Sequence, residues 1–299
     1  MSILVGGSVA LDSIESPFGK VENVLGGSAS YFAYAASFLT KVHLVGIIGE
    51  DFPQKYREIL EDQQVDLSAI EVSDKPTFNW SGKYHEDMNI RDTLHVDLSI
   101  FEDYKVNVPE NLTTCETLCL ANMSPQHQLQ MIEACTDAKF ILADTMDLWI
   151  NIERDNLEKV AAKVDLLILN DSEAKMWTEE DNIIKAGKKL LEYGPTYVCI
   201  KKGEHGATLF KGDEYFVVGA YPLEEVNDPT GAGDCFAGGL AGYLDNKNDY
   251  SFASLKEALL VGTTAASFCV EDFSFHKLIE ATPQHFENRL KRCRECVSL

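Results

Sequence analysis

Positive charge is scarce in this chain. Its 299 residues include 26 Lys and Arg against 48 Asp and Glu, which gives a formal net charge of −22. Nucleic acids and anionic membranes bind through basic surfaces, so we expect neither as a partner. A phosphorylated ligand must be held locally, by backbone amides and a bound cation, because the field of the whole protein repels it.

Long hydrophobic runs are also missing. No apolar stretch approaches the ~20 residues of a membrane-spanning helix, and residues 1–7 lack the basic and apolar regions of a signal peptide. The eight cysteines are scattered, and the Cys293/Cys296 pair has no second pair that would complete a zinc site. We therefore expect a cytoplasmic protein with reduced thiols and no membrane segment.

Two common nucleotide-binding motifs are absent. The chain has no G-x-x-x-x-G-K-[ST] sequence, which argues against a P-loop kinase. The first apolar run, residues 3–5, is followed by Gly6-Gly7, but the G-x-G-x-x-G spacing of a dinucleotide site is missing and residues 16–19 interrupt the place of its crossover helix. We therefore look for a phosphate-binding segment outside these two motifs.

That segment is residues 227–234, N-D-P-T-G-A-G-D, which predict a loop that opens onto a helix. A strand must end near Pro229, because proline donates no ladder hydrogen bond, and Thr230 is a good N-cap residue. Apolar residues then follow at helical spacing: Phe236, Leu240, Tyr243 and Leu244. The unpaired amides at such a helix start bind phosphate or a developing negative charge.

Asp234 can be interpreted in two ways. A carboxylate in a first helical turn often does no more than stabilise the helix dipole, by about 0.3–1 kcal/mol. Here a threonine and two glycines precede it, and the small residues Ala237, Gly238 and Gly239 follow. This context favours an anion site with a carboxylate at its edge, which can take a proton from an attacking hydroxyl.

Residues 228–234 resemble the signature D-T-x-G-A-G-D of the ribokinase-like (PfkB) carbohydrate and nucleoside kinases. The resemblance implies that Asp234 is the catalytic base and that the amides of Gly231, Ala232 and Gly233 hold the transferred phosphoryl group, with Thr230 beside the nucleotide. It also implies ATP and Mg²⁺ as cofactors, and K⁺ bound by carbonyls near residues 226–228 and 270. The expected reaction phosphorylates a primary hydroxyl of a sugar or a ribonucleoside.

The acceptor side of the resemblance lies in the first hundred residues. Gly26 and Gly27 precede a predicted helix, like the family glycines that contact the substrate, and Asp12 lies where the family binds two sugar hydroxyls. Tyr31 replaces the usual Asn, and its ring could stack on a base or fill the pocket. Arg91 is a further candidate for acceptor or phosphate contact, with a solvated surface charge as the alternative.

The nucleotide side rests on two further segments. Asn170 and Glu173 resemble the family motif N-x-x-E, which implies that they order Mg²⁺ through water; Glu173 also stands where a capping box places its glutamate. Lys201, Gly203 and Gly206 resemble the T-x-G-x-x-G nucleotide segment. Lys201 replaces the usual Thr, and its ammonium can contact the ATP phosphates.

Strand and helix signals alternate after Pro109, which predicts an α/β fold with a mainly parallel central sheet flanked by helices and with ligands at the carboxyl ends of its strands. Alternating polar and apolar residues over 77–84 and 93–98 predict a hairpin. We expect one ribokinase-like domain over residues 1–299, with a small β-sheet lid formed by about 12–25 and 76–100. The resemblance implies that this lid can serve as the surface of a homodimer.

Two functions remain open at this point. The first is an ATP- and Mg²⁺-dependent kinase, with sugars and ribonucleosides both retained as acceptors. The second is a nucleotide-binding regulatory protein without kinase turnover. The intact G-A-G-D and N-x-x-E sequences favour the kinase, because a sensor needs no catalytic base.

Overall fold

Nine strands form the larger of two β-sheets in the computed structural model, which describes residues 2–298. The strand order is β13-β12-β11-β10-β9-β8-β1-β4-β5. Strands from β5 to β11 are parallel, whereas β12 and β13 extend the β11 edge antiparallel. The strands are β1 Ile3–Gly6, β4 Val42–Gly49, β5 Val65–Ser73, β8 Thr117–Leu120, β9 Phe140–Asp144, β10 Leu166–Asn170, β11 Tyr197–Lys201, β12 Ala207–Lys211 and β13 Glu214–Val218. The predicted mainly parallel sheet is confirmed.

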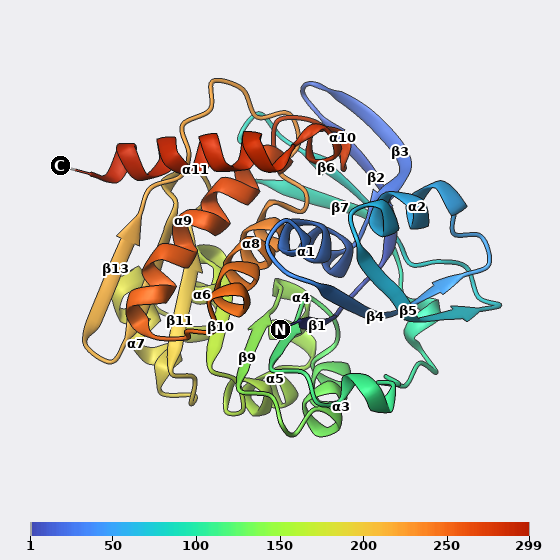
Figure 1. The fold of residues 1–299 in the computed structure, drawn as a ribbon, viewed down its shortest axis with the longest axis horizontal. Helices are drawn as coiled ribbons and strands as arrows, with labels where there is room; N and C mark the ends of the chain where they lie inside the picture. Colours follow the sequence, from blue (N-terminus) through green and yellow to red (C-terminus); the bar gives the residue numbers. More distant parts are fainter. Residues whose placement is uncertain (1, 299) are drawn as a thin grey trace.

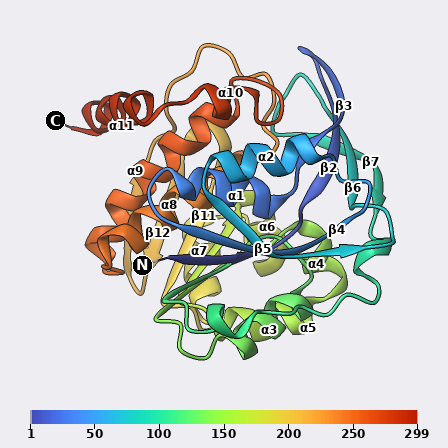
Figure 2. The same cartoon turned by 45° about the vertical axis from the view of Figure 1, so that its right-hand side comes forward.

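Helices cover both faces of this sheet (Figures 1 and 2). One layer contains α1 Ser28–Ser37, α2 Gln54–Asp62, α8 Ala232–Lys247, α9 Phe252–Cys269, α10 His276–Glu280 and α11 Pro283–Val297. The other contains α3 Pro125–Ala134, α4 Asp147–Ile152, α5 Arg154–Ala161, α6 Asp171–Thr178 and α7 Ile183–Leu191. Short 3₁₀ turns η1 Ser99–Phe101, η2 Glu110–Leu112 and η3 Gly203–His205 lie in the connections.

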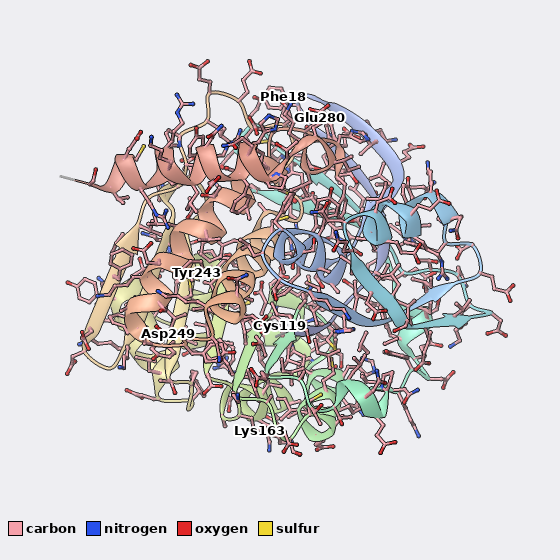
Figure 3. All side chains as sticks on the ribbon, in the orientation of Figure 1. Phe18, Cys119, Lys163, Tyr243, Asp249 and Glu280 are labelled. Carbon is pink, nitrogen blue, oxygen red and sulfur yellow. The ribbon has the colours of Figure 1, made fainter. Side chains whose placement is uncertain are left out.

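The central strands are continuous apolar runs because both of their faces are buried. On β10, Leu166 and Ile168 belong to the core under α8 and α9, whereas Leu167 and Leu169 belong to the core under α5, α6 and α7. All four side chains are fully buried. Cys119 on β8, labelled in Figure 3, is likewise fully buried. The alternation of side chains along each strand therefore divides the hydrophobic core into two layers.

A second sheet of four strands stands beside the carboxyl ends of the parallel strands, in the order β3-β2-β6-β7 (Figure 1). Its strands are β2 Ala10–Ser16, β3 Gly19–Gly26, β6 Asn79–Tyr84 and β7 Arg91–Asp97. The β2/β3 and β6/β7 pairs are antiparallel hairpins, and β2 pairs with β6 in parallel. These strands come from the two segments that were predicted to form a lid.

The helices α1 and α8 pack against each other through small residues. A Cβ on Gly238 would collide with the Phe32 carbonyl oxygen, and a Cβ on Gly242 would lie 2.9 Å from the Ala36 carbonyl oxygen. Gly239 faces α9 instead, where a Cβ would lie 2.8 Å from that of Ala265. The sequence interpretation counted Gly238 and Gly239 with the anion site; the structure instead places them in helix packing.

All eight cysteines are free thiols, and only Cys296 is exposed. Within residues 2–298, none of the helices combines the length and the apolar character needed to cross a membrane.

Gly238→Ala tests the close α1/α8 contact. The new methyl group meets a backbone carbonyl that cannot rotate away, so we expect the free energy of unfolding to fall by about 1–3 kcal/mol, as in other overpacked sites. Urea denaturation at constant pH measures this change. Gly219→Ala is the matched control, because nothing lies within 4 Å of the Cβ position there. Equal stability of the two variants would contradict the proposed contact.

Candidate active site

A cavity of about 460 Å³ lies between the small sheet and the carboxyl ends of the parallel strands. This volume falls in the range of ligand pockets, roughly 300–1,000 Å³. Most of the predicted site residues line the cavity: Asp12, Gly27, Tyr31, Arg91, Asn170, Glu173, Lys201, Gly203, Thr230, Gly231, Ala232, Gly233 and Asp234. Gly26 and Gly206 are not among the lining residues. The fold therefore gathers segments that are more than 200 residues apart in the chain.

The loop before α8 is built differently from the prediction in one respect. The N-cap of α8 is Gly231, in a left-handed conformation with φ 78°, and not Thr230. The Thr230 amide donates to Asp228 Oδ1 at 2.9 Å, and its hydroxyl donates to Tyr84 Oη at 3.1 Å. The Thr230 hydroxyl is therefore engaged with the lid, and glycine takes the cap position because it tolerates positive φ.

Asp234 lies in the first turn of α8, beside the amides that begin the helix. Burial raises the pKa of its carboxyl to about 8; the charge of Asp144 adds to the rise, and Lys201 opposes it. A general base works best when its pKa is near the operating pH. The environment of Asp234 therefore suits proton transfer better than that of an exposed capping carboxylate with a pKa near 4.

Lys201 Nζ lies 2.7 Å from Asp144 Oδ2. Within residues 2–298, this is the only ion pair whose two partners both line the cavity. Burial disfavours its charged form, but Asp144 and Glu173 outweigh this effect and raise the pKa of Lys201. A Cβ on Gly233 would lie 2.9 Å from Lys201 Nζ, so the lysine reaches the loop of Asp234. Lys201 therefore carries a fixed positive charge into the proposed phosphate site.

Asp144 was not assigned a role from the sequence, although it ends a predicted strand. The structure places it in the cavity, 4% exposed. The signal that could have identified it is its position at the carboxyl end of a parallel strand, where ligands bind in such sheets.

Asn170 and Glu173 form a capping box at the start of α6. The Glu173 amide donates to Asn170 Oδ1 at 2.8 Å, and the Asn170 amide donates to Glu173 Oε2 at 2.7 Å. Burial raises the pKa of Glu173 to about 7; Lys201 lowers this pKa and Asp144 raises it. Asn170 and Glu173 therefore cap α6, and both residues also line the cavity.

The acceptor side is organised by Asp12 on β2. Burial raises the pKa of its carboxyl to about 7, against a hydrogen bond from the Gly27 backbone, while Asp228 adds to the rise. A side chain at Gly26 would collide with this carboxylate. Gly26 therefore acts by leaving room for Asp12, and Gly27, with φ 92°, starts α1 at the cavity wall.

Tyr31 has both ring faces covered. One face stacks on Phe275, with ring centroids 4.4 Å apart, and a Cβ on Gly231 would lie 2.5 Å from the ring atoms. The side chain is 1% exposed. Of the two roles left open by the sequence, filling the pocket fits this packing, whereas stacking on a base does not.

The lid touches both ligand-binding loops. Besides the Tyr84–Thr230 hydrogen bond, Asn89 of the β6/β7 turn occupies the space where Gly203 would carry a side chain. Arg91 lies with its guanidinium 6.0 Å from the Trp80 ring and 4.0 Å from Asp147. The small sheet therefore forms one wall of the cavity, and Arg91 lines the cavity from this sheet.

Aromatic side chains form much of the remaining wall. They are Phe78, Trp80, Phe101, His127 and Trp149. Phe78 and Trp80 lie in the segment 77–84 that was predicted to form a hairpin, whereas the other three come from segments that the sequence analysis did not single out. Only the folded chain brings these rings together.

Gly203 and Gly206 differ in role. Both have positive φ, 53° and 77°, as a tight turn between β11 and β12 requires. Gly203 lines the cavity, whereas a side chain at Gly206 would collide with the Val218 carbonyl oxygen of β13. Residue 206 must therefore be glycine because the backbone of β13 lies directly against it.

Asp234→Asn should stabilise the ligand-free protein in a pH-dependent manner. Because the folded state raises this pKa to about 8, the folded protein loses stability as pH rises from the unfolded value near 4 towards 8. The neutral variant avoids this loss, so its advantage over the wild type should grow by about 2 kcal/mol or more between pH 5 and pH 8. Urea denaturation at both pH values measures it. Asp137→Asn, at an exposed site, is the control; an equal advantage at both pH values would contradict the assigned pKa.

Comparison with known proteins gives a consistent result. A sequence profile described as pfkB family carbohydrate kinase matches residues 12–280. The cytidine kinase of Thermococcus kodakarensis is 29% identical over 251 residues, which cover 81% of this chain and 88% of that protein. The nucleoside kinase of Methanothermobacter thermautotrophicus is 28% identical over 258 residues, which cover 85% and 80% of the two chains.

Solved structures show the same fold. The E. coli protein solved as Ribokinase II in complex with ATP and Mg²⁺ superposes with a TM-score of 0.77 at 21% identity, over 97% of this chain and 99% of that chain. The family resemblance and the ribokinase-like fold predicted from the sequence are thereby confirmed. On the profile match and these relatives, the chain belongs to the pfkB family of carbohydrate kinases.

Proposed function

We propose that this kinase transfers the γ-phosphoryl group of ATP to the primary hydroxyl of a ribonucleoside. The observation that carries the proposal is the position of Asp234, a carboxylate with a pKa near 8 at the amino end of α8, in one cavity with Asp12. An acceptor held by Asp12 and Gly27 would present its hydroxyl towards Asp234. The backbone amides after Gly231 face the same space.

The proposed chemistry needs four contributions from the chain. Asp234 accepts the proton of the hydroxyl as it attacks phosphorus. The amides of Gly231, Ala232 and Gly233 stabilise negative charge that develops on the phosphoryl oxygens. Lys201 adds a charge that burial shields from water, and the lid excludes water that would otherwise accept the phosphoryl group.

A magnesium ion fits this donor set. Asp144 and Glu173 place carboxylates beside the proposed phosphate site, and carboxylate oxygens with water are the ligands that Mg²⁺ prefers. Glu173 uses Oε2 in the capping box, so Oε1 can point to the cavity. When bound, Mg²⁺ would neutralise phosphate charge; Asn170 and Glu173 would hold its water ligands.

Potassium fits less well. The Val270 carbonyl, one of the oxygens that the resemblance assigned to K⁺, already accepts the amides of Asn227 at 2.9 Å and Asp228 at 3.4 Å. A carbonyl oxygen has two lone pairs, and both are used here. The proposed reaction therefore involves no K⁺.

Two observations favour a nucleoside over a free sugar. The relatives at 28% and 29% identity are named as a nucleoside kinase and a cytidine kinase. In addition, Phe78, Trp80 and Phe101 offer ring surfaces at the lid side of the cavity, and a flat base stacks on such rings. A free pentose would leave this wall uncovered.

The lid also supports a homodimer. Leu94 is 59% exposed and Val96 43% exposed on β7, which is an edge strand of the small sheet. Exposed apolar residues on an open edge favour pairing with a second copy. Sedimentation should therefore give about twice the chain mass for the wild type and a monomer for Leu94→Asp. Ile152→Asp, equally exposed on α4, is the control, and a monomeric wild type would contradict the dimer.

ADP release from ATP·Mg²⁺ across a panel of acceptors tests the function itself. The panel contains cytidine, adenosine, inosine, guanosine, ribose and fructose. We expect at least one nucleoside to exceed both sugars in kcat/KM by tenfold or more, because only nucleosides cover the aromatic wall. A preferred sugar would contradict the acceptor class. Nucleotide binding without turnover on any acceptor would restore the regulatory alternative.

Asp234→Asn, assayed beside the wild type with the preferred acceptor, tests the catalytic assignment. Loss of a general base should lower kcat by about 10²–10⁴. The KM for ATP should change little, because the phosphate-binding amides remain in place. Asp137→Asn should keep wild-type kcat, and an unchanged kcat in Asp234→Asn would reject this residue as the base.

A further inference from the structure

A second hollow, of about 320 Å³, lies on the outer surface of the helical layer that contains α9, α10 and α11. Tyr221 and Phe268 form its apolar part, and Lys277, Arg289 and Arg292 are among the side chains around it. It shares no lining residue with the active-site cavity. Its volume is at the lower end of the range of small-molecule sites, roughly 300–1,000 Å³.

One face of α11 supplies most of the polar wall. His285, Asn288, Arg289 and Arg292 recur at helical spacing, so their side chains project on the same side. All four carry N–H groups that can donate hydrogen bonds to an anion. This face of α11 therefore presents several donors to a single ligand.

The charge around the hollow is opposite to that of the whole protein. Three cations line it: Lys277, Arg289 and Arg292. Lys277 pairs at 2.8 Å with Glu280, the last residue of α10, which is labelled in Figure 3, and Arg289 pairs at 2.7 Å with Glu271. Arg292 forms no ion pair within residues 2–298. In a chain with net charge −22, this is a local site for an anion.

Arg289 is held rigidly at the apolar end of the hollow. Its guanidinium lies 3.7 Å above the Phe268 ring and 5.1 Å from the Tyr221 ring. Its Nη1 donates to Glu271 Oε2 at 2.7 Å and to Ser267 Oγ at 3.2 Å. A fixed guanidinium beside two rings offers a flat surface on which a planar ligand can stack.

We propose that this hollow is a second ligand site, which binds a small organic phosphate with a flat ring. The phosphate lies against Arg292 and Lys277, and the ring lies against Tyr221 and Arg289. A nucleoside monophosphate has both parts, and it is the product class of the proposed reaction. The choice of this compound rests on the proposed function, whereas the anion site rests on the residues alone.

Equilibrium dialysis of radiolabelled CMP against the full chain tests the site. The wild type should bind two equivalents, one in the active-site cavity and one in the hollow. Arg292→Ala should retain the first and weaken the second at least tenfold, because the phosphate loses its unpaired cation. Lys291→Ala is the matched control, since it removes one charge from the same helix at a residue outside the hollow; it should bind as the wild type does.

Two further measurements distinguish loss of the second site from other causes of weaker CMP binding. Unlabelled ribose 5-phosphate should displace CMP from the hollow less effectively than unlabelled AMP, because it lacks the ring. The KM for ATP should be the same in Arg292→Ala and the wild type, and thermal melting should show that the variant folds. The same number of CMP equivalents in Arg292→Ala as in the wild type, or a raised KM for ATP, would overturn the proposal.

The dialysis experiment tests the second site and the kinase assay tests the proposed function, so that either proposal can be rejected without the other. If no acceptor is phosphorylated but an Arg292-dependent equivalent of CMP remains, the proposed function falls and the second site stands. If a nucleoside is phosphorylated but only one equivalent of CMP binds, the second site falls and the function stands.

Discussion

The burial of several carboxylates around one lysine is the constraint on which the rest of the site depends. Asp144 ends β9, Glu173 lies in the first turn of α6 and Asp234 in the first turn of α8, and Lys201 compensates only part of their charge. Burial raises the pKa values of Glu173 and Asp234, and the charge of Asp144 adds to the rise while Lys201 opposes it. The same arrangement suits the proposed role of Asp234 as a base and the proposed binding of a divalent cation.

The positions of these charges depend on close helix packing. Gly238 and Gly242 let α8 approach α1 at backbone distance, so that the amino ends of both helices reach one cavity. Gly27 and Gly231, each with positive φ, begin the two helices. Tyr31 fills the space between them and stacks on Phe275. Asp12 and Asp234, the proposed acceptor contact and the proposed base, are therefore held at a fixed separation by helix packing.

Because the chain is strongly acidic, the positions of its cations indicate where anionic ligands can bind. With a net charge of −22, the chain repels phosphates at long range, and binding has to rely on short-range contacts. Lys201 can serve this purpose in the active-site cavity, where its partly buried side chain lies beside Gly233. Arg292 and Lys277 can serve it in the hollow beside α11. Two separate cationic positions in such a chain are consistent with two separate anionic ligands.

The sequence by itself determined the α/β fold, the segments of the small sheet and the loop that ends in Asp234, because hydrophobic periodicity, Pro229 and the closely spaced glycines act locally. It also placed Asn170 and Glu173 at a helix start, since a capping box spans only four residues. The tertiary structure alone decided that Tyr31 is packing, that Gly231 rather than Thr230 caps α8, and that Asp144 pairs with Lys201. These outcomes depend on contacts between residues 57 to 244 positions apart, such as Lys201 with Asp144 and Tyr31 with Phe275, which no local pattern encodes.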